Sequence, residues 1–141
     1  MSELRYCFHC QEDVGYRLFS RDETRVVKGV KVRVKIDYAL CEKCGEPVDV
    51  PSLASQNEIR VFDAYKKKAG LLTSEEIKEI RKRYGLSAAK FAKRLGMGEK
   101  SITRYENGAI QTKEVDLLLR LVSLQENFDF ILRLPPASLA L

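Results

Sequence analysis

Four cysteines constrain the fold of this chain more than any other feature. They form two pairs of identical spacing, Cys7 with Cys10 and Cys41 with Cys44, and the sequence contains no other cysteine. Two residues between thiolates allow both sulfurs to reach one ion, and two such pairs supply the ligands of a tetrahedral structural zinc site. We therefore predict one structural Zn²⁺ per chain, bound by these four side chains.

Two disulfides are the alternative use of four cysteines. The N-terminus lacks the pattern of an export signal, and the sequence has no long apolar run. These observations favour reduced thiols, and they predict a cytoplasmic protein that does not associate with a membrane. A zinc site closed by four thiolates has no open position for water, and the single histidine, His9, completes no convincing catalytic set. We therefore predict that the protein is not an enzyme.

Thirty residues separate Cys10 from Cys41, and this insert has the pattern of β-structure. Apolar residues at positions 30, 32, 34 and 36 alternate with basic residues at 31, 33 and 35. A period of two predicts a strand with one buried face and one basic, solvated face. We predict that residues 1–50 form a small β-sheet domain stapled by zinc, because a domain of this size rarely has a sufficient core of its own.

The rest of the chain has the pattern of helices. Residues 51–72 are predicted to be a linker that breaks the pattern at 51–56 and then forms a connecting helix over Glu58–Lys68. Residues 73–141 are predicted to be an all-α domain, in which Thr73, Ser87 and Thr112 begin the first, second and fourth helices as N-caps and Glu99–Glu106 is the third helix. The predicted fold class is therefore α+β, with a zinc-stapled β-sheet domain before a helical domain.

A short Gly-containing segment at 96–98 joins two of these predicted helices, which is the helix-turn-helix arrangement. The second helix of such a unit enters the major groove of DNA, where its exposed N-terminal residues meet base edges. The residues expected to do so are Glu99, Lys100, Ser101, Thr103 and Arg104. The residues expected at the phosphates, which set register rather than sequence, are Ser87, Lys90, Lys93 and Arg94.

The distribution of charge agrees with a nucleic-acid partner. The formal net charge is +5, and residues 57–104 hold thirteen Lys and Arg against six Asp and Glu. A basic surface attracts nucleic acid, although an ordinary solvated surface also carries charge.

The last long helix is apolar on two sides. One stripe contains Val115, Leu118, Leu119 and Val122, and a second contains Leu117, Leu121 and Leu124, beyond which Phe128 and Ile131 continue the apolar pattern. A helix of this kind is either deeply buried or shared with another subunit. In a domain this small we predict that Leu117, Leu121 and Leu124 form a homodimer interface.

The segment from Leu86 to Gly108 resembles the Xre/Cro family of helix-turn-helix repressors through its Phe91–Gly96 and Ile102–Gly108 motifs. Together with the upstream cysteine pairs, it resembles the MqsA antitoxins, also called the YgiT-type zinc finger and helix-turn-helix family. This resemblance implies an antitoxin of a type II toxin–antitoxin system, whose zinc domain binds a partner toxin and whose helical domain represses its own operon at a palindromic double-stranded DNA operator. It also implies zinc at the four cysteines and base reading by Lys100 and Arg104.

The chain departs from the family pattern at two positions. The family motif has Asn where this sequence has Lys100, and many Xre proteins carry Gln where it has Ala88. Three alternatives therefore remain open from the sequence: a stand-alone zinc-containing Xre regulator without a toxin, an RNA-binding zinc-ribbon protein or enzyme, and the front part of a longer antitoxin that continues beyond the apolar tail at 137–141.

Overall fold

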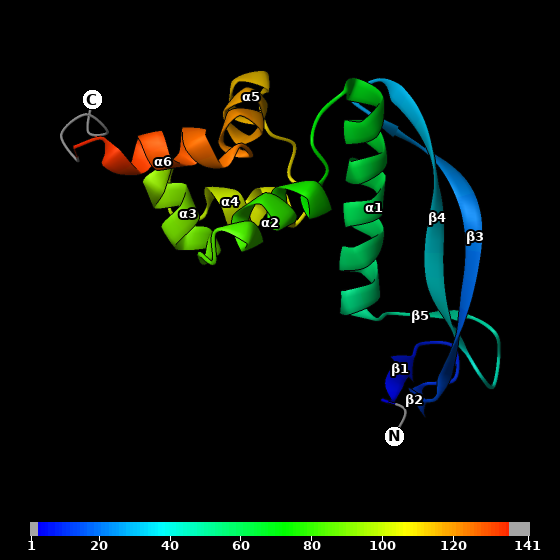
Figure 1. The fold of residues 1–141 in the computed structure, drawn as a ribbon. Coiled ribbons are helices and arrows are strands. Elements are labelled where there is room, and N and C mark those ends of the chain that lie inside the picture. Colours follow the sequence, from blue (N-terminus) through cyan, green and yellow to red (C-terminus); the bar gives the residue numbers. More distant parts are fainter. Residues whose placement is uncertain (1–2, 136–141) are drawn as a thin grey trace. The chain divides into compact units, whose positions relative to one another are not determined.

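The computed structural model describes residues 3–135, so the apolar tail at 137–141 lies outside the described residues. The chain divides into two compact units, and the boundary between them falls between Tyr65 and Lys66. The first unit contains antiparallel sheets and most of one long helix, and the second is helical (Figure 1). The predicted α+β fold class is therefore confirmed.

Two small sheets build the N-terminal unit. One pairs β1 (Arg5–Cys7) with β2 (Glu12–Val14), and the other has the order β3–β4–β5. Strands β3 (Tyr16–Val27) and β4 (Val30–Cys41) form an antiparallel ribbon of twelve residue pairs, and β5 (Pro47–Val48) pairs with the end of β4. Lys28 and Gly29 both have positive φ, as a two-residue hairpin turn requires.

The pattern of burial along β4 confirms the predicted alternation. Val32, Val34 and Ile36 are buried, and the basic residues between them are exposed. Beyond Ile36 the burial changes to the other face of the strand, where Ala39 and Cys41 join the core beside the cysteine pairs. Strand β4 therefore buries one face along its first part and the opposite face at its end, beside the cysteine pairs.

The connecting helix is longer than predicted. Helix α1 (Pro51–Ala69) has 19 residues, so the expectation of a break over 51–56 was wrong. Proline is favourable at the first position of a helix, because its missing N–H would have no partner there and its fixed φ suits the helix. The helix ends before Gly70, which adopts a positive φ. The unit boundary lies inside α1, and the proposed division at residues 50 and 72 stays a prediction.

Five helices form the described part of the C-terminal unit, and none of the described helices is long and apolar enough to cross a membrane. They are α2 (Ser74–Arg83), α3 (Ala88–Arg94), α4 (Ser101–Glu106), α5 (Lys113–Val122) and α6 (Gln125–Arg133). Thr73, Ser87 and Thr112 are N-caps whose side chains accept a backbone N–H, as predicted, and Thr73 forms a capping box with Glu76.

Aromatic rings occupy the centre of this unit. Tyr84, Phe91 and Phe128 lie together, and the Tyr84 and Phe128 ring centroids are 4.1 Å apart. Phe128 is 2% exposed, so it belongs to this core and not to the exposed surface of Leu117, Leu121 and Leu124. The chain turns at Ser123 and Leu124 between α5 and α6, and this break directs Phe128 into the core.

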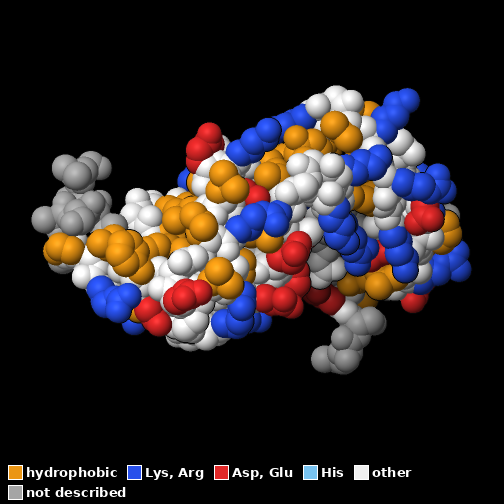
Figure 2. Space-filling view, turned by 45° about the horizontal axis from the view of Figure 1, so that its top comes forward, with side chains coloured by type: hydrophobic (Ala, Val, Ile, Leu, Met, Phe, Trp, Pro, Cys, Tyr) orange, Lys and Arg blue, Asp and Glu red, His pale blue; other side chains and the backbone are white. Residues whose placement is uncertain are grey.

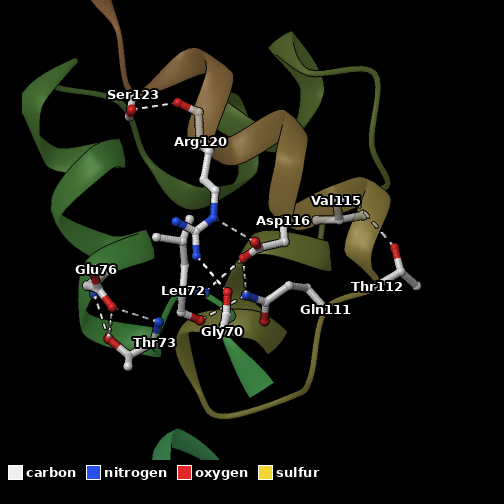
Figure 3. A network of polar contacts seen from close by, with 10 residues as sticks. All are labelled: Gly70, Leu72, Thr73, Glu76, Gln111, Thr112, Val115, Asp116, Arg120 and Ser123. Atoms are coloured by element: carbon white, nitrogen blue, oxygen red, sulfur yellow. Dashed lines mark hydrogen bonds and ion pairs between the residues drawn. The ribbon is translucent and has the colours of Figure 1, made fainter. Parts of the chain in front are cut away.

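A buried polar network fixes the start of α5 against the segment before α2 (Figure 3). One Asp116 carboxylate oxygen accepts hydrogen bonds from Leu72 N–H and Gln111 Nε2, and the other accepts one from Arg120 Nε. The guanidinium of Arg120 also donates to the carbonyl oxygen of Gly70. Burial opposes the charge of Asp116, but these donors outweigh it and lower the pKa of its carboxyl. Segments more than forty residues apart are thus held together by an ionised side chain.

Candidate metal centre and nucleic-acid interface

The four cysteines meet at one point in the N-terminal unit. Their sulfur atoms all lie within 4.8 Å of one another, with 3.6 Å between the Sγ atoms of Cys7 and Cys44 and 3.9 Å between those of Cys10 and Cys41. Four ligands at about 2.3 Å from a tetrahedral ion are about 3.8 Å apart. The cluster therefore fits a metal ion such as Zn²⁺, and the predicted association of the two pairs is confirmed. All four are free cysteines rather than disulfides.

The backbone around the second cysteine pair stabilises the negative charge of a thiolate. Burial disfavours the charged form of Cys41, but N–H groups of Cys44 and Lys43 donate to its sulfur and lower its pKa to about 7. Burial, together with hydrogen bonding to the neighbouring sulfurs, raises the pKa of Cys10. Without a cation the cluster thus resists carrying four negative charges, and a divalent ion would remove this resistance. The zinc ion would have a structural role, because the four thiolates fill a tetrahedral shell.

Helices α2, α3 and α4 form the helix-turn-helix region. Phe91, Ala92 and Ile102 are fully buried where α3 and α4 pack, and Leu95 is buried beside them. Gly96 has a φ of 73°, so the chain turns there in a conformation that side chains disfavour. Helix α4 begins at Ser101, two residues later than the expected start at Glu99, and the Lys100 side chain before it makes no capping hydrogen bond.

Most of the predicted DNA-contacting residues are exposed. Ser87, Lys90, Lys93 and Arg94 lie on the surface of α3 and at its N-cap, and Glu99, Lys100, Thr103 and Arg104 lie on the surface of α4 and just before it. Lys90, Lys93 and Glu99 line one hollow together with Ala89 and Met97. Sequence reasoning missed those last two residues, which carry no charge or polar group that would mark them.

Ser101 departs from the prediction. Its side chain was expected to be exposed but is only 8% accessible, because it lies at the first turn of α4 close to Gly98. A Cβ added at Gly98 would lie 3.3 Å from the Ser101 hydroxyl oxygen. The expected exposure was therefore wrong, and Ser101 packs within the turn.

A buried ion pair holds the end of α4. Two nitrogens of the Arg81 guanidinium each lie 2.8 Å from a Glu106 carboxylate oxygen, and the third donates to the carbonyl oxygen of Leu86. The hydrogen bonds to Glu106 raise the pKa of Arg81. Sequence reasoning missed this pair, since 25 residues separate its members and no local spacing predicts such a contact. It positions α4, the helix expected to enter the groove.

Lys66 provides a second anchor for α4. Its side chain is fully buried, and its Nζ donates to the carbonyl oxygen of Tyr105 at 3.3 Å. Because the last turn of α4 leaves carbonyl groups without intrahelical donors, a cation there stabilises the helix end. The predicted connecting helix ended at Lys68, and Lys66 in its last turn has this additional contact.

The second apolar stripe of α5 is exposed. Leu117, Leu121 and Leu124 are 60%, 59% and 55% accessible, and Phe130 on α6 is also exposed. Val115, Leu119 and Val122 face the core or its edge, which confirms that the two stripes differ. Exposed leucines at this spacing are available to a partner subunit, and the homodimer stays a prediction.

Residues 77–124 match the family model described as helix-turn-helix. The matched segment contains α3, α4 and α5 and most of α2. It indicates a DNA-binding regulator of the Xre type, and it confirms the helix-turn-helix part of the resemblance. No curated protein sequence matches the chain. The match begins at Ile77, so the resemblance of the cysteine-bearing region to the MqsA antitoxins stays a prediction.

Proposed function

We propose that this DNA-binding regulator is the antitoxin of a type II toxin–antitoxin system, and that it represses its own operon as a homodimer on a palindromic operator. One observation carries the DNA-binding part: α4 is anchored by buried Ile102 and Glu106 and exposes Thr103 and Arg104 in a matched helix-turn-helix segment. The antitoxin part is supported by the order of the two modules, a four-cysteine cluster before the helix-turn-helix.

Each exposed residue has a proposed role at the operator. Lys100 and Arg104 read base edges, and Glu99 and Thr103 adjust the fit of α4 in the groove. Ser87, Lys90, Lys93 and Arg94 contact phosphates from α3 and fix the register of the protein on the duplex. The exposed Leu117, Leu121 and Leu124 join two copies, so that two α4 helices meet the two half-sites of a palindrome.

Two substitutions separate base reading from phosphate contact. Arg104→Ala is expected to weaken binding to the operator by about 1–3 kcal/mol and to relax the preference at one base pair, since a bidentate contact to guanine is lost. Lys93→Ala is expected to weaken binding to all sequences and to reduce the salt slope of the affinity by about 1. Fluorescence anisotropy with the selected operator and a scrambled duplex, measured over a range of salt concentrations, checks both.

The two variants serve as controls for each other because both side chains are exposed and neither removal exposes core. Equal losses of specificity in the two proteins would contradict the assigned roles.

The antitoxin assignment is tested with the product of the neighbouring gene. We expect that protein to arrest growth when expressed alone, to co-purify with this chain, and to be neutralised by it. A neighbour that is harmless and does not form a complex would leave operator binding intact and assign the chain as a stand-alone regulator. Metal analysis of the same preparation is expected to give one zinc ion per chain.

A further inference from the structure

The two long edges of the β3–β4 ribbon have different hydrogen-bonding surroundings. Asn57 on α1 accepts the N–H of Asp37 at 3.0 Å and donates to its carbonyl oxygen at 2.8 Å, so a helix side chain replaces a neighbouring strand on β4. Arg60 likewise donates to the carbonyl oxygen of Lys35. Within residues 3–135, β3 forms the outer edge of its sheet over all twelve residues (Figure 1).

The register identifies which backbone groups of β3 point outward. Asp37 directs both its N–H and its carbonyl away from β3, and it lies directly opposite Ser20. Opposite residues in an antiparallel pair either exchange both hydrogen bonds or neither, and the two kinds alternate. Ser20 therefore also directs its N–H and carbonyl outward, and so do the alternate residues. The outward set is Leu18, Ser20, Asp22, Thr24 and Val26.

The side chains of β3 add a chemical preference. Arg17, Arg21 and Arg25 lie on one face, where both Arg21 and Arg25 are 2.9 Å from carboxylate oxygens of Glu23. The Tyr38 hydroxyl also donates to this carboxylate, and these hydrogen bonds, with that from Tyr38 foremost, lower the pKa of Glu23 to about 2. Strand β3 thus places three arginines and one acid on this face, and Figure 2 shows Lys and Arg side chains gathered over the ribbon, at the right of the view.

The opposite face of β3 is apolar at two positions. Leu18 is 64% exposed and Val26 is 63% exposed, and both are in the outward set. A strand added beside β3 would therefore place alternate side chains against arginine on one face. On the other face it would meet Leu18 and Val26 at the two ends and the polar Ser20, Asp22 and Thr24 between them. A second copy of β3 would bring the same excess of arginine and is a poorer match.

We propose that the outer edge of β3 binds an extended, acidic segment of a partner protein by adding it to the sheet as a further strand. Its acidic side chains lie beside Arg17, Arg21 and Arg25, its apolar side chains lie beside Leu18 and Val26, and its backbone pairs with the outward set. This deepens the proposed function, because it names the surface and the chemistry by which a partner toxin is bound. Charged residues on an edge strand also discourage indiscriminate pairing, which suits an edge reserved for a complementary segment.

A peptide tests the edge without any toxin. The probe is a fluorescently labelled ten-residue peptide of alternating Glu and Val, and the control replaces every Glu with Lys. Thr24→Pro removes one outward N–H without removing a hydrogen bond to β4, whereas Thr24→Ala keeps that N–H. We expect the full-length protein and Thr24→Ala to bind the acidic peptide within about twofold of each other, and Thr24→Pro to bind at least about tenfold more weakly.

Amide hydrogen exchange on the unmodified protein keeps the test decisive if Thr24→Pro fails to fold. We expect the amides of Leu18, Ser20 and Asp22 to exchange faster than those of their inward neighbours and to slow when the acidic peptide is added. Absent binding, equal binding of both peptides, or unchanged exchange would overturn the proposal. An equal loss of duplex-DNA affinity in Thr24→Pro would do so too, by assigning the edge to nucleic acid.

The outcomes also separate this inference from the antitoxin assignment. A toxin that binds Thr24→Pro and Thr24→Ala equally would overturn the edge alone. Peptide binding with the expected pattern, in the absence of any toxin from the neighbouring gene, would overturn the antitoxin assignment alone.

Discussion

Chelation of the metal is expected to unfold the cysteine-bearing end of the N-terminal unit while the helical unit stays folded. The core at this end contains six buried residues, of which Cys7 and Cys41 are themselves proposed ligands. Strands β1, β2 and β5 have only three, three and two residues, too few to be stable without a staple. Structural zinc contributes about 10–16 kcal/mol of apparent binding free energy in small domains. Removing the ion therefore costs more free energy than the burial of so small a core supplies.

Amide NMR spectra before and after chelation measure this effect residue by residue. Signals of β1, β2 and β5 are expected to collapse, signals from α2 to α6 to persist, and zinc to restore the first set. Cys41→Ser should reproduce the loss because an alcohol does not replace the thiolate, whereas His9→Ala should not, since His9 is exposed and outside the cysteine cluster. Metal analysis first establishes that the ion has been removed completely. An unchanged spectrum at that point would refute the structural role of the ion.

The features predicted correctly from the sequence are those set by neighbouring residues. Thr73, Ser87 and Thr112 cap helices through contacts that span three residues, and the cysteine pairs place two sulfurs together within one knuckle. Local chemistry of this kind does not depend on the rest of the fold. The alternation of apolar and basic residues along β4 was predictable because it too is a pattern of neighbouring residues.

The features that were missed depend on distant segments or on ambiguous residues. Pro51 is compatible with both a chain break and a helix start, and only the structure shows the second. Ser101 is a polar residue of a type that is usually exposed, but the turn at Gly98 packs against it. Asp116 bonds to Leu72 and Glu106 bonds to Arg81, and these partners lie 44 and 25 residues away, where no periodicity in the sequence connects them.

Arg81→Ala is expected to destabilise the helical unit by about 3–5 kcal/mol, because it leaves the buried Glu106 carboxylate without its partner. The Glu106 side chain is 7% exposed, and the same guanidinium also satisfies the carbonyl oxygen of Leu86. Urea denaturation followed by circular dichroism measures the change in the free energy of unfolding. Arg83→Ala is the matched control, since Arg83 is an exposed arginine of the same helix, and its removal should cost less than about 0.5 kcal/mol.

The double variant Arg81→Met with Glu106→Met distinguishes the cost of an unpaired charge from the worth of the pair itself. Burying two apolar side chains of similar volume leaves no charge without a partner, so most of the stability lost in Arg81→Ala should return. Operator affinity should recover less completely, because two methionine side chains cannot tie the end of α4 to α2 through directed hydrogen bonds. Equal stability of Arg81→Ala and Arg83→Ala would show that Glu106 finds water or another donor, and that the pair does not position the helix.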